Sequence, residues 1–278
     1  MTETALVLGA GGITGIAWHL GLIVGLREAG VDLTGAHLIV GTSAGSVTGA
    51  LLASGVDPVR AQRLEARLGA TDPPMRPDWA RGAEAFALLS DENRTPEEIR
   101  AGVGRLAVAA DVIAEERYVD ALSRRLPGHE WPERPLLITA VDTATGRPMA
   151  WDRRSGVPLN RAVAASCAVP CLFPPVTING SRYMDGGVRS GTNADFASTA
   201  ARVVVLAPLA PVRMRGAPTA EIDALRERSR VILVAPDAEA MAALGPNVFD
   251  TSRWEPATEA AMAQGRRIAP EVAGVWTG

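Results

Sequence analysis

The chain has 278 residues, of which 47% are hydrophobic and 21% are charged, and its formal net charge is −3. This length and apolar content suffice for one large core or two small ones, and the lack of a basic field argues against a nucleic-acid partner. All 28 cationic residues are arginine, so the chain cannot use a Schiff-base lysine, a P-loop lysine or a Ser–Lys hydrolytic pair.

The cysteine content and the start of the chain bear on compartment and membrane contact. Cys167 and Cys171 are too few for a disulfide framework or a zinc site, which favours two buried thiols in a reducing, cytoplasmic compartment. We expect no metal ion and no other cofactor. The N-terminus lacks the pattern of a signal peptide, and no charge-free apolar stretch reaches about 18 residues. We therefore expect no membrane span, and any membrane contact should be peripheral.

The first part of the chain alternates predicted strands with predicted helices. Apolar runs that end at glycine predict buried strands, and apolar residues at every third or fourth position predict helices with one buried face. Gly30 is placed to end the first helix, and Asp57 is placed to begin the third. The predicted order is a strand at 4–9, a helix at 15–29, a strand at 37–41, and helices at 44–54 and 57–68.

Residues 70–95 interrupt this alternation. The segment begins with a proline-rich loop and continues with side chains that share one helical face, namely Trp79, Ala83, Phe86 and Ala87. If this face were exposed, residues 73–90 would form a mobile flap that meets lipid. The same pattern is typical of a helix that packs on the core, and we favour this second interpretation.

The rest of the chain continues the mixture of strands and helices. Thr95-Pro96 predicts a helix start, and Asn179-Gly180 predicts a two-residue hairpin turn. Strands are expected at 136–141, 148–151, 176–178, 182–184, 203–207 and 231–235, and helices near 115–126, 157–165, 219–228, 237–244 and 255–265. This order predicts an α/β fold with a mainly parallel sheet covered by helices on both faces. No linker interrupts it, so we expect a single domain over residues 1–278.

The pentapeptide Gly41-Thr42-Ser43-Ala44-Gly45 lies between a predicted strand and a predicted helix. This is the context of a nucleophile elbow, in which a sharp turn lifts a serine hydroxyl above the sheet and two glycines allow strand and helix to approach. Ser43 would then lie at a helix N-terminus, where the N–H of Ala44 could stabilise an oxyanion. An ordinary turn of small residues is the alternative.

A second glycine-rich turn, at residues 9–15, also joins a strand to a helix. Its open N–H groups could complete an oxyanion hole for a neighbouring serine. The spacing of Gly9, Gly12 and Gly15 also fits a dinucleotide fingerprint, which requires an acidic residue at the end of the second strand. Asp32 precedes that strand instead of ending it, and the serine elbow occupies the required position. We therefore rank the oxyanion interpretation above the nucleotide one.

A serine nucleophile requires a base, and histidine is its usual partner. An α/β-hydrolase places that histidine late in the chain, but all the histidines here are early: His19, His37 and His129. A carboxylate is therefore the favoured base. Asp185 follows a predicted strand, and Gly186 and Gly187 after it would allow another backbone to approach closely. Spacing alone does not place Asp185 beside Ser43, and a plain Asp-Gly turn is the alternative.

Four segments together resemble the patatin-like phospholipase family in order and spacing. They are the glycine-rich loop with the residues after it (10–21), the elbow (41–45), and residues 165–175 and 183–188. The matches lie within about residues 4–207. The resemblance implies a three-layer α/β/α sandwich, in which residues 208–278 complete the sheet and the helices.

The resemblance also implies specific roles for residues of this chain. It makes Ser43 the nucleophile and Asp185 its base, and it places the oxyanion hole at the N–H groups of Gly11, Gly12 and Ile13. Proteins of this family cleave phospholipids, lysophospholipids and other fatty-acyl esters, so we expect a lipid or fatty-acyl ester as the substrate.

Two residues depart from the family pattern. Ala10 stands where the family usually has glycine, and Thr14 stands where it usually has arginine or lysine. Backbone donors form the hole, so the hole should survive both changes, whereas any contribution of the cation to loop position or to an anionic substrate is lost. Thr14 therefore favours an alternative, a non-catalytic lipid-binding or regulatory protein, while the intact Ser43 and Asp185 argue against it. A dinucleotide-binding enzyme is the third hypothesis.

Overall fold

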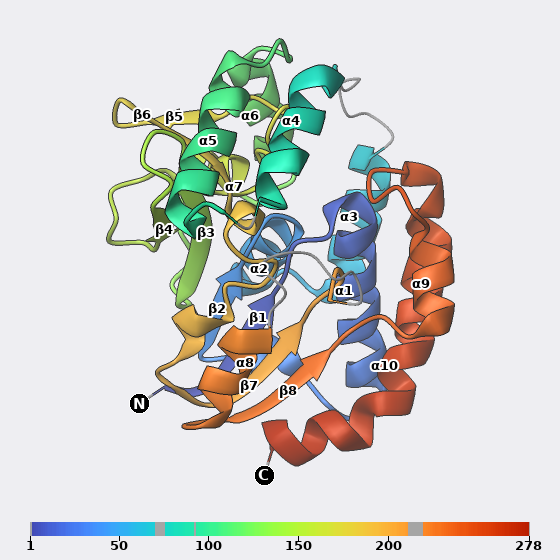
Figure 1. Ribbon diagram of the computed structural model, residues 1–278. Coiled ribbons are helices and arrows are strands. Elements are labelled where there is room, and N and C mark those ends of the chain that lie inside the picture. The colour runs from blue at the N-terminus through green and yellow to red at the C-terminus, as the bar shows by residue number, and fades with distance from the viewer. Residues whose placement is uncertain (1, 70–75, 92, 211–218, 278) are drawn as a thin grey trace.

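The computed structural model describes residues 2–69, 76–91, 93–210 and 219–277. Residues 73–75 of the flap hypothesis lie outside this part of the chain. The described residues form a central sheet with helices packed on both of its faces (Figure 1).

One sheet of eight strands forms within the described residues. In chain order the strands are β1 (Thr2–Leu8), β2 (Leu38–Gly41), β3 (Leu136–Asp142), β4 (Pro148–Trp151), β5 (Val176–Ile178), β6 (Ser181–Asp185), β7 (Ala200–Leu206) and β8 (Arg230–Val234). Their spatial order is β5-β6-β3-β2-β1-β7-β8, with β4 also paired to β3. Strands β3, β2, β1, β7 and β8 pair in parallel, and β4, β5 and β6 pair antiparallel. The prediction of a mainly parallel sheet is confirmed.

The α-helices of the described residues lie close to where periodicity predicts most of them. They are α1 (Gly12–Glu28), α2 (Ala44–Ala53), α3 (Pro58–Gly69), α4 (Trp79–Leu89), α5 (Pro96–Ala109), α6 (Glu115–Ser123), α7 (Leu159–Ser166), α8 (Thr219–Arg226), α9 (Ala238–Leu244) and α10 (Trp254–Trp276). The first of them begins at Gly12, earlier than expected, because the glycine-rich turn runs directly into the helix. A capping box between Thr95 and Glu98 begins α5, as Thr95-Pro96 predicted.

Alternate strand residues point to opposite faces of the sheet, and different helices cover each face. On β1, Leu6 and Leu8 belong to the core cluster shared with α1, α2 and α10. Ala5 and Val7 face the other layer, which includes α8 and the short 3-10 turn Ala194–Ala197. The central strands are therefore buried on both faces, and the three-layer α/β/α architecture is confirmed.

Helices α1 and α10 pack closely because glycine lies between them. A Cβ on Gly25 of α1 would lie 2.9 Å from the Cα of Met262 on α10. Trp18 Nε1 also donates a hydrogen bond to Gln264 Oε1 at 3.0 Å. Helix α10 runs for 23 residues through Pro270, so the helix end that we expected near residue 265 is wrong. Packing on α1 stabilises the helical turn in which the proline lacks an N–H.

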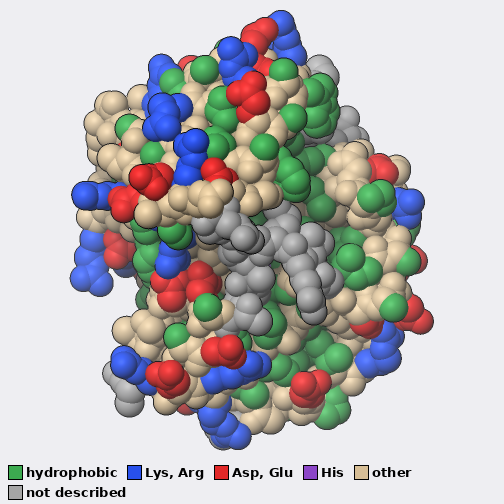
Figure 2. Space-filling view, viewed as in Figure 1, with side chains coloured by type: hydrophobic (Ala, Val, Ile, Leu, Met, Phe, Trp, Pro, Cys, Tyr) green, Lys and Arg blue, Asp and Glu red, His purple; other side chains and the backbone are tan. Residues whose placement is uncertain are grey.

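Helices α4 and α5 lie side by side at one end of the sheet (Figure 1). The buried side of α4 includes Ala85, which joins Val103 of α5 in a third hydrophobic cluster. Trp79 and Phe86 are 71% and 59% exposed, and Ala83 and Ala87 of the same face are exposed as well. The expectation that this face of α4 packs on the core is therefore wrong. Ala85 and its partly buried neighbours carry the packing instead, and hydrophobic side chains remain visible over α4 in Figure 2.

Candidate active site

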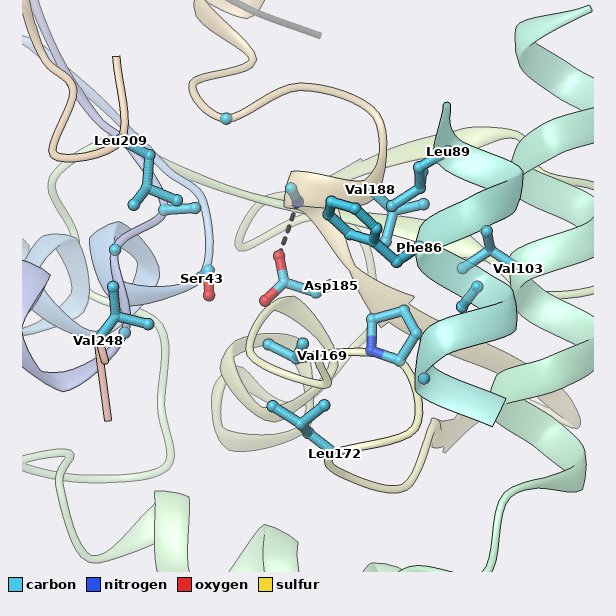
Figure 3. A pocket seen from close by; sticks show the side chains of 18 of the residues that line it. Ser43, Phe86, Leu89, Val103, Val169, Leu172, Asp185, Val188, Leu209 and Val248 are labelled. Atoms are coloured by element: carbon cyan, nitrogen blue, oxygen red, sulfur yellow. Dashed lines mark hydrogen bonds between the residues drawn. The ribbon is translucent and has the colours of Figure 1, made fainter. Parts of the chain in front are cut away.

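Strand β3 lies between the two segments that carry Ser43 and Asp185. Gly41 ends β2 and pairs with Ile138, and Asp185 ends β6 and pairs with Ala140, two residues further along β3. The register of β3 therefore brings the two predicted residues to the same point of the sheet. Figure 3 shows both side chains in the wall of one pocket.

Ser43 has the geometry of a nucleophile elbow. It is the N-cap of α2 and has φ 53° and ψ −118°, a conformation that is strained for a residue other than glycine. A Cβ on Gly41 would lie 2.7 Å from the Cα of Ser46, and one on Gly45 would overlap the backbone of Leu8. Glycine at both positions therefore lets the helix cross the strand ends, as the pentapeptide predicted.

Asp185 is buried beside this turn. Its Oδ1 accepts the N–H of Gly187 at 2.7 Å (dashed line in Figure 3), and its Oδ2 has no hydrogen-bond partner among the described residues. Burial raises the pKa of the Asp185 carboxyl to about 7, against the opposing effects of the nearby Ser43 hydroxyl and the Gly187 N–H. The Ser43 hydroxyl is thus near enough to affect the carboxylate, although it does not reach the geometry of a full hydrogen bond.

The glycines after Asp185 allow the close approach that the sequence predicted. A Cβ on Gly187 would lie 2.9 Å from Asp185 Oδ1, and one on Gly186 would lie 2.8 Å from the carbonyl oxygen of Thr139. A larger residue at position 186 would push this carboxylate loop away from β3, and one at position 187 would displace the Asp185 carboxylate.

The glycine-rich turn lies on the other side of Ser43, and Gly11 and Gly12 line the same pocket. Within the described residues, the N–H groups predicted as oxyanion donors have no hydrogen-bond acceptor: those of Gly11, Gly12, Ile13 and Ala44. Ile13 and Ala44 lie in the first turns of α1 and α2, where backbone N–H groups are open and favour negative charge. A Cβ on Gly15 would lie 3.5 Å from Pro208 Cγ and 3.6 Å from Ala44 Cβ, which is ordinary van der Waals contact.

The two residues that depart from the family pattern, Ala10 and Thr14, bring no charged group to the site. Thr14 is fully buried, and its hydroxyl has no hydrogen-bond partner among the described residues. Its N–H donates to the carbonyl oxygen of Val248 at 3.1 Å, which ties the turn to the C-terminal part of the chain. The Cβ of Ala10 lies 3.5 Å from where a Cβ on Gly187 would be, so the alanine fits beside the carboxylate loop.

The histidines do not take part in this site. His19 is fully buried, and burial lowers its pKa to about 3, so it is neutral. His37 shares a hydrogen bond of 2.8 Å with Thr4 Oγ1, and His129 is exposed. None of the three lines the pocket that holds Ser43 and Asp185. Among the described residues that line this pocket, Asp185 is the one carboxylate.

A buried polar network behind the site could not be predicted from the motifs. Thr42 and Thr139 share a hydrogen bond of 2.8 Å between their hydroxyls. Asn193 Nδ2 donates to Thr42 Oγ1 at 3.1 Å and to the carbonyl oxygen of Gly186 at 3.2 Å. The network connects the elbow, β3 and the carboxylate loop. It therefore fixes the positions of the segments that carry Ser43 and Asp185 relative to each other. Ser166 adds to it by accepting the N–H of Ser43 at 2.9 Å.

Two cavities meet at Ser43. The larger, of about 550 Å³, contains Asp185 and is lined by α4 and by Leu209, Val248 and other apolar side chains shown in Figure 3; we call it the wide chamber. The smaller, of about 250 Å³, lies between α2 and α6, and we call it the narrow chamber. Residues from the last part of the chain, such as Val248, carry no motif and were missed by sequence reasoning.

The two cysteines are both free. Cys171 is buried, as expected, whereas Cys167 is only partly buried, so the expectation of two buried thiols is wrong for it. Cys167 lines the narrow chamber, where desolvation of its thiol and then the charge of Asp185 raise its pKa to about 12. Its thiol lies 3.3 Å from the carbonyl oxygen of Ser43 and is not a nucleophile at neutral pH. No group of three or more metal-ligating side chains and no helix able to cross a bilayer is found in the described part of the chain.

A search against protein families matches residues 6–198 to the patatin-like phospholipases. The chain belongs to the patatin-like phospholipase family. The match includes the glycine-rich turn, the elbow and the carboxylate loop, so the resemblance seen in four separate segments is confirmed.

Similar sequences within this family come from bacteria and fungi. An uncharacterized NTE family protein of Mycobacterium bovis is 30% identical over 204 residues, which cover 70% of this chain and 47% of the relative. Lysophospholipase nte1 of Aspergillus fumigatus is 29% identical over 194 residues, covering 68% of this chain and 11% of the relative. This patatin-like chain therefore spans less than half the length of these relatives.

Two solved structures also align with the patatin-like chain. VipD from Legionella pneumophila covers 97% of this chain and 67% of its own, at 14% identity and a TM-score of 0.47. A chain of the ExoU–SpcU complex from the type III secretion system of Pseudomonas aeruginosa covers 98% of this chain and 52% of its own, at 19% identity and a TM-score of 0.43.

Proposed function

We propose that this patatin-like protein is a serine acyl hydrolase that cleaves phospholipids, lysophospholipids or other fatty-acyl esters. The observation that carries the proposal is the pairing of Ser43, on a strained elbow, with the buried carboxylate of Asp185 in the wall of an apolar cavity. Membership of the family supports lipid hydrolysis, and the name of the fungal relative supports lysophospholipids as one substrate.

The first half of the reaction forms an acyl-enzyme. Asp185 accepts the hydroxyl proton as Ser43 Oγ attacks the ester carbonyl carbon, and the carbonyl π-electrons move onto the oxygen. The N–H groups of the glycine-rich turn and of Ala44 donate hydrogen bonds to this oxyanion. The carbonyl then re-forms, the ester C–O bond breaks, and Asp185 returns its proton to the departing alcohol oxygen.

The second half of the reaction releases the fatty acid. A water molecule takes the place of the alcohol, Asp185 accepts its proton, and the resulting hydroxide attacks the acyl carbon. The tetrahedral intermediate collapses, the bond to Ser43 Oγ breaks, and the proton passes from Asp185 to the serine. A pKa of about 7 suits a carboxyl that accepts a proton in one step and donates it in the next.

Peripheral contact with a lipid surface is part of the proposal. Trp79 and Phe86 are exposed on α4 and also line the wide chamber. An aromatic face beside the mouth of an apolar cavity lets an acyl lipid pass from a lipid surface to Ser43 without crossing water. We therefore propose that α4 is the part of the chain that meets lipid.

The decisive experiment is active-site labelling. The wild-type protein should react with a fluorophosphonate probe and hydrolyse at least one ester of a panel that includes lysophospholipids and p-nitrophenyl acyl esters. Ser43→Ala should lose both properties while keeping its circular dichroism spectrum, with a fall in turnover of about 10³-fold or more. Turnover close to that of the wild type in purified Ser43→Ala would rule out Ser43 as the nucleophile. A folded wild-type protein that reacts with no probe and no ester would favour the lipid-binding alternative.

A further inference from the structure

Ser43 lines both chambers, whereas α4 lines only the wide one and α2 and α6 line only the narrow one. Gly12, Val169 and Phe249 lie at their boundary and line both. An ester has two substituents on its carbonyl carbon, the acyl chain and the alcohol part. Once the carbonyl carbon is at Ser43 Oγ, each substituent needs its own space, and the two chambers provide two spaces.

The position of Asp185 distinguishes the chambers. Asp185 lines the wide chamber and does not line the narrow one. The group that receives the proton from Ser43 has to return it to the departing alcohol oxygen, so that oxygen must lie within hydrogen-bond reach of Asp185. The alcohol part of the ester therefore extends into the wide chamber, which leaves the narrow chamber for the acyl chain.

The narrow chamber has the chemistry of a site for one aliphatic chain. Val47 of α2 and Ala121 and Leu122 of α6 contribute apolar surface to it. Arg125 also lies in its wall, but this arginine is buried in an ion pair with Glu65, so its charge is neutralised within the protein.

The sizes of the two chambers agree with this division. The narrow chamber has a volume of about 250 Å³, against about 550 Å³ for the wide one. The alcohol part of a glycerolipid carries the glycerol, the head group and any second chain, so it requires the larger space. Helix α4 lies at the mouth of the wide chamber. The part of the lipid that does not enter the chamber could stay there in the membrane or micelle.

We propose that the narrow chamber between α2 and α6 binds the acyl chain that is cleaved, and that its walls select chain length. This inference rests on the proposed hydrolase function, because it uses the proton route through Asp185. Its consequence is that residues of α6 set the acyl specificity, whereas residues of α4 set the specificity for the alcohol part.

The experiment varies one half of the ester at a time. A series of p-nitrophenyl esters with acyl chains from acetate to palmitate varies the acyl half, and a series of acetate esters of longer alcohols varies the other. Ala121→Phe fills the narrow chamber, and Leu122→Ala enlarges it. Ala83→Phe, on the exposed side of α4 in the wide chamber, is the matched control.

In the wild type, kcat/KM should rise about fourfold for each added acyl methylene until the chamber is full, and then level off. Ala121→Phe should move this limit to shorter chains and Leu122→Ala to longer ones, each without moving the preference in the alcohol series. Ala83→Phe should move the alcohol preference and keep the wild-type acyl limit. If Ala83→Phe shortens the acyl limit and the α6 variants do not change it, the acyl chain lies in the wide chamber and the proposal is overturned.

A binding measurement separates this inference from the proposed function. Decanoate should raise the melting temperature of the wild type and of Ala83→Phe, and this rise should be lost in Ala121→Phe. If the protein hydrolyses no ester but shows this pattern of melting temperatures, the proposed hydrolase activity is rejected and the proposed chain-binding site is retained. An equal rise in all three proteins, or none in the wild type, would overturn the site itself. If Ala121→Phe does not fold, Leu122→Ala decides, since it should strengthen the effect of a chain longer than decanoate.

Discussion

Burial of Asp185 disfavours its ionised form, and the raised pKa that results suits a group that has to accept and return a proton. The side chain is 4% exposed and has one oxygen bound to the Gly187 N–H, which leaves the other for Ser43. A histidine would normally perform this proton transfer, and the histidines of this chain lie elsewhere. In the proposed mechanism the whole proton route therefore depends on one carboxyl, whose pKa burial raises to about 7.

Replacing this carboxyl tests the route directly. Asp185→Asn keeps the size of the side chain but cannot accept a proton, so kcat/KM for a soluble ester should fall by about 10³-fold or more. His37→Ala and His129→Ala are the controls and should keep most of the activity, because both residues lie outside the chambers. A loss in either histidine variant as complete as in Asp185→Asn would replace the dyad by a triad.

The raised pKa of Asp185 also predicts a pH dependence for activity and for stability. The base acts when ionised, so kcat/KM should rise with pH through about 7 and level off above it. An unfolded aspartate ionises near ~3.9, so between about pH 4 and 7 the folded protein holds a proton that the unfolded chain has lost. The stability that this proton contributes is full below about pH 4 and is lost as pH rises through about 7.

Thermal melting can check this sign. Asp185→Asn does not titrate at this position. The melting temperature of the variant minus that of the wild type should therefore increase by a few degrees or more as pH rises from about 4 to 7. A rate profile that is flat from about pH 5 to 9, or a stability difference that changes in the opposite direction, would show that Asp185 is ionised throughout.

Among the elements, α4 exposes the apolar face that we expected it to bury. Its Ala85 side packs on α5, and its Trp79 and Phe86 side is left open beside the wide chamber. A helix that supported only the core would not leave two of its largest apolar side chains in water. The proposed contact of α4 with lipid would account for this division.

Trp79→Ala should therefore act on aggregated substrate. We expect activity on phospholipid vesicles to fall about tenfold, as for an aromatic side chain that is buried at a surface, and activity on a short soluble ester to fall much less. Val108→Ala, which removes an exposed apolar side chain of α5 that lines neither chamber, is the control and should change neither rate. Equal losses on both substrates together with a lowered melting temperature would place Trp79 in the core and not at a lipid surface.

For the molecule as a whole, the segment beyond the motifs completes both the core and the site. Helix α10 covers α1, β8 extends the sheet beside β7, and Val248 accepts the N–H of Thr14 while lining the wide chamber. We propose that residues 1–278 form one domain, because the motif-bearing part leaves a face of α1 uncovered without α10.

A truncated chain tests this proposal. Residues 1–229 keep every motif but lack β8 and α10, and the apolar surface of α1 would be exposed to water. We expect this fragment to show no cooperative thermal transition and no fluorophosphonate labelling, whereas the full chain shows both. Cooperative melting of the fragment would mean that the motif-bearing part is a domain in its own right.

Sequence alone determined the local features, because each depends on residues close together in the chain. Strand and helix positions followed from apolar periodicity, and the elbow at Ser43 followed from glycines at fixed offsets that permit a close helix crossing. Family resemblance selected Asp185 as the partner, since no spacing rule links two residues so far apart in the chain.

Tertiary structure alone decided how these features combine. The register of β3 places Ser43 next to Asp185, and a strand register depends on long-range pairing and not on local propensity. The open face of α4, the continuation of α10 through Pro270 and the division of the site into two chambers also arise from packing between distant segments. An apolar pattern shows which side chains are able to be buried, but the partners available in the fold decide which of them are.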